Sequence, residues 1–178
     1  PTDDSGAHED TETAIVAITG VSGGGASENG TQSTTISIVE NDAAPTVTLA
    51  TSAASIAENA AGTLTLTATL SVATFENVTV ALDPTGTATE GTDYGTISNI
   101  TVSAGDTSGT ATFDPTDDSK YESATAETSV VAITSVSGGN ATESGTQTAT
   151  ISITENESAP TVTLATSGST LDENSNST

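Results

Sequence analysis

Carboxylates gather in short clusters along this chain, and the clusters lie beside segments in which apolar and polar residues alternate. The triplets END and ENE, at 40–42 and 155–157, both lead into the same words, APTVTLATS. Oxygen ligands of this kind bind hard divalent cations. The chemistry that these residue types favour is therefore the binding of cations.

The same inventory argues against catalysis. The sequence offers no nucleophile–base pair and no phosphate-cradling loop, and its one histidine, His8, is expected to have no specific role. Paired carboxylates also serve glycoside hydrolysis, but that chemistry needs a sugar cleft, usually with aromatic residues. Aromatic residues make up only 2% of the chain. We therefore expect no enzyme.

The charge balance excludes two further classes of partner. The chain has 24 acidic residues against one basic residue, with a net charge of −23. A nucleic-acid-binding surface needs a basic footprint, and anionic lipid attracts basic segments. No apolar run approaches the roughly 18 residues of a membrane span. We expect no nucleic acid and no membrane insertion in this segment, and a chain that repels itself unless cations are present.

A repeat organises the chain. Residues 36–58 return almost unchanged at 151–173, an offset of 115 residues that holds back to Glu12 against Glu127. A repeat of this length is a whole domain rather than one turn of a solenoid. We expect the C-terminal part of one unit at 1–44, a complete unit at 45–159 and the start of the next unit at 160–178.

Within the complete unit, period-two alternation of apolar and polar residues predicts strands and no helix. The regularity of this alternation argues against disorder, which the acidic, Ser/Thr-rich composition would otherwise suggest. Seven short strands in about 110 residues are typical of a Greek-key, immunoglobulin-like β-sandwich. The predicted strands cover 46–50, 63–70, 78–82, 97–102, 110–113, 128–134 and 148–154.

Seven alternating strands place the acidic residues unevenly. The chain should enter the sandwich at one end, here called the proximal end, and leave at the other, the distal end. Ten of the unit's fourteen acidic residues then fall at the distal end, three fall at the proximal end, and Glu127 begins a strand. Such crowding is electrostatically costly, and divalent cations would relieve it. The ten are Glu58, Asp83, Glu90, Asp93, Asp114, Asp117, Asp118, Glu122, Glu155 and Glu157.

One stretch carries a family signature. Residues 86–94 read GTATEGTDY, which resembles the GTA-x-x-G-x-DY pattern of the Calx-beta domain, the calcium-binding module of sodium/calcium exchangers, integrin β4 and many bacterial surface proteins. Acidic residues after the first, fifth and last predicted strands agree with that family in order. The chain thus resembles tandem Calx-beta repeats of a bacterial-type extracellular surface or fibre protein.

The resemblance implies calcium bound by loops at the joint between consecutive domains. Asn41 and Asn156 interrupt an acidic tail that is often a run of Asp in the family, so the number of ions per joint could be lower or vary. Tyr94 is expected to be a packing anchor, and Asp83, Glu90 and Asp114 to be solvated or to serve turns. The implied calcium ligands are Glu58, Asp93, Asp117, Asp118, Glu122, Glu155 and Glu157 in the complete unit, Asp3, Asp4, Glu9, Glu40 and Asp42 in the preceding unit, and Glu173 in the following unit.

Three functional hypotheses follow. The first is a long extracellular filament or surface stalk, in which calcium ions rigidify the joints between repeats. The second is a ligand-binding module of a large bacterial adhesin that recognises a sugar, ice or a protein. The third, a calcium sensor, requires an attached transporter that nothing here indicates. The expected partners are neighbouring repeats of the same chain, and cations that bridge acidic surfaces could also join chains laterally into fibres.

Overall fold

The computed structural model of the chain describes residues 7–122, 124–170 and 173. These residues contain no helix, and hence none of the length and apolarity that a membrane span requires. The predicted all-β class is confirmed. The strands are β1 (Ala7–His8), β2 (Glu12–Ala17), β3 (Ser33–Ile38), β4 (Thr46–Thr51), β5 (Ser55–Ala57), β6 (Leu64–Leu70), β7 (Ala73–Thr74), β8 (Val78–Gly86), β9 (Ile100–Val102), β10 (Ser108–Phe113), β11 (Glu127–Ser137), β12 (Thr142–Glu143) and β13 (Thr148–Thr154).

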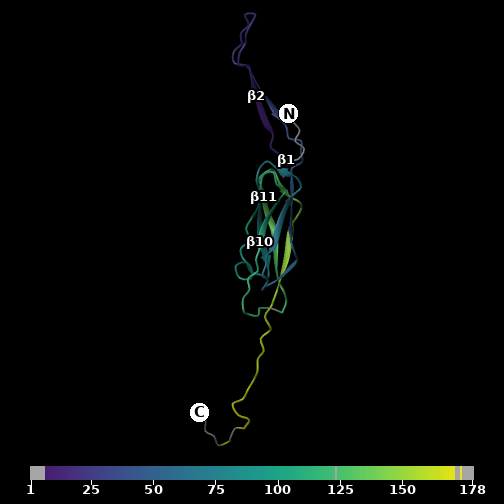
Figure 1. The fold of residues 1–178 in the computed structure, drawn as a ribbon, viewed down its shortest axis with the longest axis vertical. Coiled ribbons are helices and arrows are strands. Elements are labelled where there is room, and N and C mark those ends of the chain that lie inside the picture. Colours follow the sequence, from purple (N-terminus) through teal and green to yellow (C-terminus); the bar gives the residue numbers. More distant parts are fainter. Residues whose placement is uncertain (1–6, 123, 171–172, 174–178) are drawn as a thin grey trace.

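Two sheets form a sandwich, which the chain enters at one end and leaves at the other (Figure 1). One sheet has the order β10-β6-β4-β12 and the other the order β5-β13-β11-β8-β9. The first predicted strand is β4, which pairs with β6. The short strand β5 that follows it was not predicted; it crosses to the other sheet and pairs in parallel with β13. This crossing carries the residues after β5 to the distal end, beside the last strand.

The core lies between the two sheets and follows the predicted alternation. The apolar residues of β6 are buried, and the threonines between them are exposed or half-buried. From the opposite sheet, Val131 and Ile151 are fully buried. Burying one such side chain contributes about 1.5–3 kcal/mol. These facing rows stabilise a fold that has no cysteine to crosslink it.

The strand β8 is longer than predicted, and this moves one acidic residue. It runs to Gly86 rather than ending at residue 82, so Asp83 lies exposed within the strand and not in a distal loop. The sequence Asp83-Pro84 indicated a turn because proline donates no backbone hydrogen bond. However, β9 covers β8 only between Val78 and Val80. Beyond that point β8 is a sheet edge on one side, where proline is tolerated.

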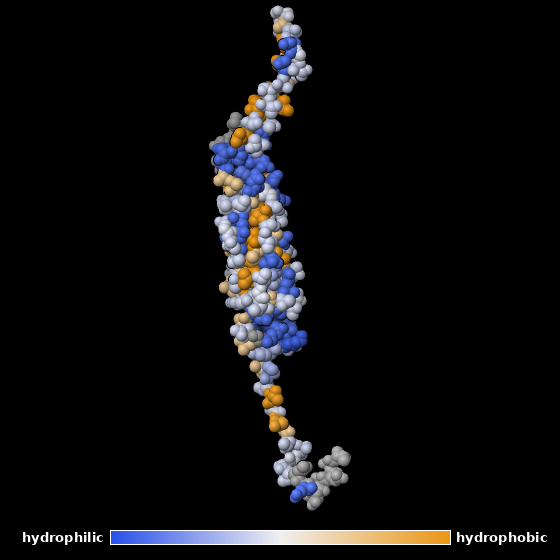
Figure 2. All heavy atoms as spheres, turned by 180° about the vertical axis from the view of Figure 1, so that it is seen from behind, coloured by the Kyte–Doolittle hydropathy of each residue, from blue (hydrophilic) through white to orange (hydrophobic). Residues whose placement is uncertain are grey.

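The segments that flank the sandwich carry exposed apolar residues. Strands β2 and β3 form an antiparallel hairpin with Ile15 and Ile36 on its surface. In the C-terminal segment, Val162 and Leu164 are almost fully exposed, and residues 155–170 form no strand. Figure 2 shows these apolar residues on the hairpin and on the tail, with hydrophilic residues gathered at both ends of the sandwich.

Candidate metal centre

The signature stretch 86–94 turns the chain tightly at the distal end. Gly86 has φ 128°, and a Cβ there would lie 2.1 Å from the carbonyl oxygen of Thr128, so only glycine fits this crossing. The N–H groups of Thr87 and Ala88 both donate to that same oxygen, at 2.9 and 3.0 Å. The turn is therefore held against the first residues of β11.

Asp93 is positioned by the end of this turn. Its Oδ2 accepts a 2.5 Å hydrogen bond from the N–H of Thr89. The next residue, Tyr94, is 1% exposed and stacks on Phe113 with ring centroids 4.7 Å apart. The prediction that Tyr94 is a packing anchor is confirmed, and this anchor holds Asp93 at the rim of the core.

Glu58 directly follows the crossing strand β5 and is buried, with 5% of its surface exposed. Its N–H donates to the carbonyl oxygen of Thr154 at 3.0 Å, so its backbone continues the pairing of β5 with β13. Its Oε1 accepts a 3.1 Å hydrogen bond from the N–H of Asp118. A carboxylate with so little access to water needs compensating partners.

Glu155 directly follows β13 and collects backbone donors. Its Oε2 accepts from the N–H of Glu122 at 2.8 Å, and its Oε1 from the N–H groups of Asn156 and Glu157, both at 3.0 Å. Hydrogen bonds to the charged form of a carboxyl group lower its pKa. The pKa of Glu155 is accordingly lowered from 4.5 to about 2, chiefly by the bond from Glu122.

These elements bring two groups of carboxylates together. In each group the oxygen atoms lie within 4.8 Å of one another: one group is Glu58, Glu122 and Glu155, and the other is Asp93, Glu122 and Glu127. Glu122 belongs to both groups, so the two form one continuous acidic cluster at the distal end. They are the only such groups among the residues described.

The proximity of these carboxylates opposes their ionisation. Burial is the largest cause of a raised pKa in Glu58, Glu122 and Glu127, and the negative charges around each residue add to it. The pKa of Glu157 rises to about 7, first through a hydrogen bond shared with the Glu155 carboxylate and then through burial. Full ionisation of this cluster is therefore unfavourable unless a cation is present.

The pKa values predict how stability depends on pH in a chelator. Between pH 4.5 and about 7, folded Glu157 keeps a proton that the unfolded chain has lost. The free energy of unfolding should therefore fall as pH rises through this window, and Glu58, Glu122 and Glu127 act in the same direction. Glu155 contributes stability above pH 4.5 that is lost only as pH falls towards about 2.

The measurement is chemical denaturation in a chelator at several pH values across this window. Glu157→Gln should make the dependence shallower, because it removes the group with the largest upward shift. A free energy of unfolding that rises with pH across the window would contradict these protonation states.

The structure brings together some of the predicted ligands and separates others. Glu58, Asp93, Glu122 and Glu155 lie in the two groups. The other predicted ligands of the complete unit, Glu157, Asp117 and Asp118, lie outside the two groups. The charges of Glu58 and Asp117 nevertheless raise the pKa of Glu157.

Asp118 is turned towards the basic residue of its own loop. Its Oδ1 accepts a 2.6 Å hydrogen bond from the N–H of Lys120, and its Oδ2 lies 3.5 Å from Lys120 Nζ. The Lys120 side chain is 82% exposed, so this ion pair contributes little to stability. Glu90 serves its turn, as expected, by accepting from the N–H of Ile97 at 2.7 Å.

Sequence reasoning assigned no binding role to Glu127, which the structure places in the second group. It is the first residue of β11, paired with Ile153 of β13. The repeat contained a usable signal, since Glu12 stands at the equivalent position and also begins a strand, β2. Because an acidic residue begins this strand in both copies of the repeat, at the distal end where carboxylates are crowded, Glu127 could have been predicted as a ligand.

The segment before the sandwich repeats the backbone pattern seen around Glu155. Glu40 accepts from the N–H groups of Asn41 and Asp42 at 2.7 and 2.6 Å, and from the N–H of Glu9 at 2.7 Å. These bonds lower the pKa of Glu40. Glu9 thus corresponds structurally to Glu122, and the triplets END and ENE adopt the same arrangement.

The remaining predicted ligands are Asp3, Asp4 and Glu173. Asp3 and Asp4 lie outside the described residues. Glu173 is exposed in the C-terminal segment.

The donor set fits calcium. Calcium takes six to eight oxygen ligands, largely from carboxylates, and the two groups offer carboxylate oxygens alone. Beside them, Glu157 Oε2 is buried, and it has no hydrogen-bond partner among the described contacts. A cation there would neutralise the charges that raise the pKa values of the cluster.

Comparison with solved structures places the fold. The chain is similar to the crystal structure of an apo-form Calx CBD1 domain, with a TM-score of 0.52 and 18% identity over 64% of this chain and 98% of that chain. The structure of CBD12 from CALX1.2 aligns with a TM-score of 0.49 and 18% identity, over 61% of this chain and 43% of that one. No protein-family model and no curated protein matches the sequence. The first likeness confirms the predicted Calx-beta-like sandwich.

Proposed function

We propose that this chain is a calcium-binding structural repeat of a long extracellular filament or surface stalk, in which calcium ions rigidify the joints between repeats. The observation that carries the proposal is the pair of carboxylate groups that share Glu122. Glu155 of this cluster directly follows the last strand, β13. Figure 1 shows that the chain leaves the sandwich at this end. An ion held there would bind the loops of one unit to the segment that leads to the next.

The flanking segments support a tandem arrangement. Val162 and Leu164 are 96% and 97% exposed, yet their equivalents one repeat earlier, Val47 and Leu49, are 0% and 7% exposed in the core. The exposed Ile36 likewise corresponds to the fully buried Ile151. Both flanks therefore have the apolar pattern of sandwich strands, as expected of parts of neighbouring units.

Calcium would act at the joint through charge. Without it, the carboxylates of Glu58, Glu122 and Glu155 repel one another beside the link, which leaves the link free to bend. With it, one ion neutralises and crosslinks side chains from different loops. Occupancy at 100 times the dissociation constant stabilises a folded unit by about 2.7 kcal/mol per site.

The same chemistry supports an extracellular location. Extracellular calcium modules typically have dissociation constants of about 10⁻⁴ to 10⁻³ M, a range suited to the calcium concentration outside cells. The partners of this unit are then the neighbouring repeats of its own chain. Cations between the acidic surfaces of adjacent chains would join filaments side by side.

A binding role in an adhesin is the second candidate, favoured by one face of the sandwich. On the outward side of β10-β6-β4, Thr48, Thr69 and Ser108 lie in register across three strands, and all are exposed. In a chain of net charge −23, this face presents hydroxyl groups. Such a surface could recognise a sugar, ice or a protein.

Imaging distinguishes the two roles. A protein with several copies of residues 45–159 in tandem should appear by electron microscopy as straight rods with a uniform axial repeat in calcium. In a chelator it should appear as flexible strings of beads, because the link between sandwiches loses its crosslink. Equal flexibility in both conditions would reject the structural role and favour the binding module.

A further inference from the structure

At the proximal end of the sandwich, far from the carboxylate cluster, polar side chains of the preceding segment contact loops of the sandwich. A cleft of about 230 Å³ lies between residues 8–12 on one side and Phe75, Glu76, Gly139 and Asn140 on the other. The first set precedes the β2–β3 hairpin, and the second belongs to loops of the complete sandwich. The cleft is therefore at the joint between the preceding segment and this sandwich.

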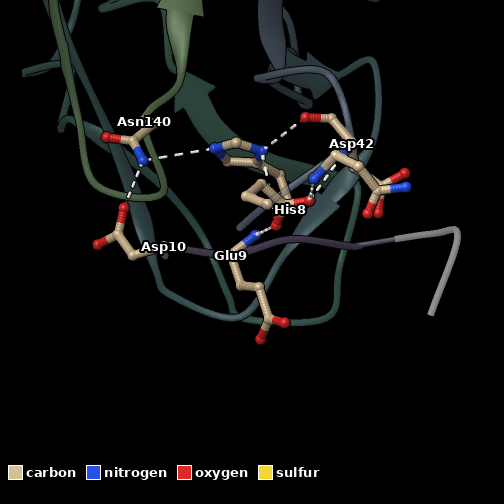
Figure 3. A network of polar contacts seen from close by, with 7 residues as sticks. His8, Glu9, Asp10, Asp42 and Asn140 are labelled. Carbon is tan, nitrogen blue, oxygen red and sulfur yellow. Dashed lines mark hydrogen bonds and ion pairs between the residues drawn. The ribbon is translucent and has the colours of Figure 1, made fainter. Parts of the chain in front are cut away.

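His8 lies at the centre of this joint and is 8% exposed (Figure 3). Strand β1 pairs in parallel with β7, which places His8 opposite Thr74. Its Nδ1 lies 3.2 Å from the carbonyl oxygen of Asp42, and its Nε2 lies 3.4 Å from Nδ2 of Asn140. These partners fit one tautomer, in which Nδ1–H donates and Nε2 accepts. The expectation that His8 has no specific role is wrong.

Asn140 reaches this histidine from a turn in which its own backbone has the left-handed conformation. It is the one non-glycine residue with positive φ in the described part of the chain, at 52°. Its side-chain amide also donates to Oδ1 of Asp10 at 2.6 Å, so one NH₂ group contacts both partners (Figure 3). Asparagine tolerates this left-handed conformation better than most residues.

The turn that carries Asn140 is seated tightly on its own sandwich. A Cβ at Gly138 would lie 2.1 Å from the carbonyl oxygen of Asn77, and one at Gly139 would lie 2.7 Å from Cγ2 of Thr74. The N–H of Gly139 donates to Glu76 Oε2 at 3.2 Å. The turn therefore holds the Asn140 amide in a fixed position on the sandwich. The contacts of this amide with His8 and Asp10 join the two sides of the joint.

The residues in contact are departures from the repeat. At the offset of 115, Gly25 stands where the complete unit has Asn140. Glu9 corresponds to Glu122, because the N–H of Glu9 donates to Glu40 just as the N–H of Glu122 donates to Glu155. In this alignment, Tyr121 occupies the position that His8 has in the preceding segment. Both changes thus fall at the same joint, one on each side, and the two changed side chains face each other.

We propose that His8, Asp10 and Asn140 form a matched clasp that fixes the angle of this joint without a metal ion, and that its partner is specifically the preceding unit of the chain. The clasp is separate from the carboxylate cluster of the complete sandwich, which lies at its opposite end. It adjoins Glu9 and Glu40, the counterparts of Glu122 and Glu155, so its contribution is measured with calcium removed. A unit with glycine at the position of Asn140 cannot form it. The clasp thereby makes this joint chemically distinct from others in a tandem array.

The test uses residues 1–178, which contain no cysteine. Spin labels at Thr34→Cys in β3 and Thr110→Cys in β10, both exposed, report the distance across the joint by pulsed dipolar spectroscopy. In a chelator we expect a narrow distance distribution for the labelled parent. Asn140→Gly should lose it, because glycine accepts the same φ but has no amide. Asp10→Ala, at an exposed position, should broaden the distribution in the same way.

Asn156→Gly is the matched control, since it removes an amide at the distal end and should leave the distribution narrow. In a second measurement, His8→Ala should shift the NMR resonances of the Asn140 side-chain amide. Distributions for Asn140→Gly and Asp10→Ala as narrow as that of the parent would overturn the proposal. Unchanged Asn140 amide resonances in His8→Ala would also overturn it.

Discussion

Replacing Glu122 by glutamine should remove most of the stabilisation that calcium gives this chain. Glu122 is the only residue shared by the two carboxylate groups, so the change weakens both at once. One site occupied at 100 times its dissociation constant contributes about 2.7 kcal/mol. For a domain of this size that corresponds to a rise of roughly 10 °C in melting temperature. Glutamine keeps the size of the side chain and removes its charge.

The measurement is the difference in melting temperature between calcium and a chelator. Asp83→Asn is the matched control, because it also removes one carboxylate, from an exposed position in β8 outside both groups. It should respond to calcium like the parent. In the chelator, Glu122→Gln should be at least as stable as the parent, since it relieves repulsion from Asp93 and Glu155. A full calcium response in Glu122→Gln would show that the cluster is not the site.

The fold was predictable because most strands bury one face only. In β6 the apolar residues alternate with threonines over the whole strand, and the structure buries the apolar set. The alternation of apolar and polar residues did not predict the last part of β8, because Asp83 and Pro84 are typical of a turn. Whether a proline interrupts a strand depends on whether a neighbouring strand needs its N–H. That depends on the length of β9, a tertiary property that no local pattern contains.

The candidate site was only partly predictable for a related reason. The order of acidic residues along the chain indicated the crowded end, and the structure gathers Glu58, Asp93, Glu122 and Glu155 there. The orientation of each side chain depends on contacts that the sequence does not reveal. Asp118 turns to the backbone and side chain of Lys120, whereas Glu127 is carried into the cluster by the pairing of β11 with β13.

The joint at the proximal end illustrates the limit of reasoning from repeats. The repeat has Tyr121 rather than a second histidine at the position matching His8, a difference that by itself favours the expectation of no specific role. The structure instead places His8 against Asn140, a second departure from the repeat. Two departures 132 residues apart in sequence become informative only when the fold shows that they touch.

Replacing Tyr94 by alanine should cause a large loss of stability and also weaken the response to calcium. The ring is 1% exposed and stacks on Phe113, with centroids 4.7 Å apart and an interplanar angle of 23°. Truncating a buried aromatic side chain to alanine typically costs about 3–5 kcal/mol. Asp93 precedes this residue, and its carbonyl oxygen accepts from the N–H of Thr116 at 3.0 Å. A cavity beneath the turn should therefore displace Asp93 from the second carboxylate group.

Tyr94→Phe separates the packing of the ring from the hydroxyl group. It keeps the stacked ring, so both the free energy of unfolding and the calcium response should stay close to those of the parent. Denaturant unfolding measures the first quantity, and calcium titration by calorimetry measures the second. A Tyr94→Ala variant that loses less than about 1 kcal/mol, well below the expected range, would show that the turn does not depend on its anchor. If the variant instead loses stability but binds calcium with unchanged affinity, packing of the core does not position Asp93. The signature GTATEGTDY is then two independent features, a turn seated by Gly86 and a buried ring, and the carboxylate between them is held by its bond to Thr89 alone.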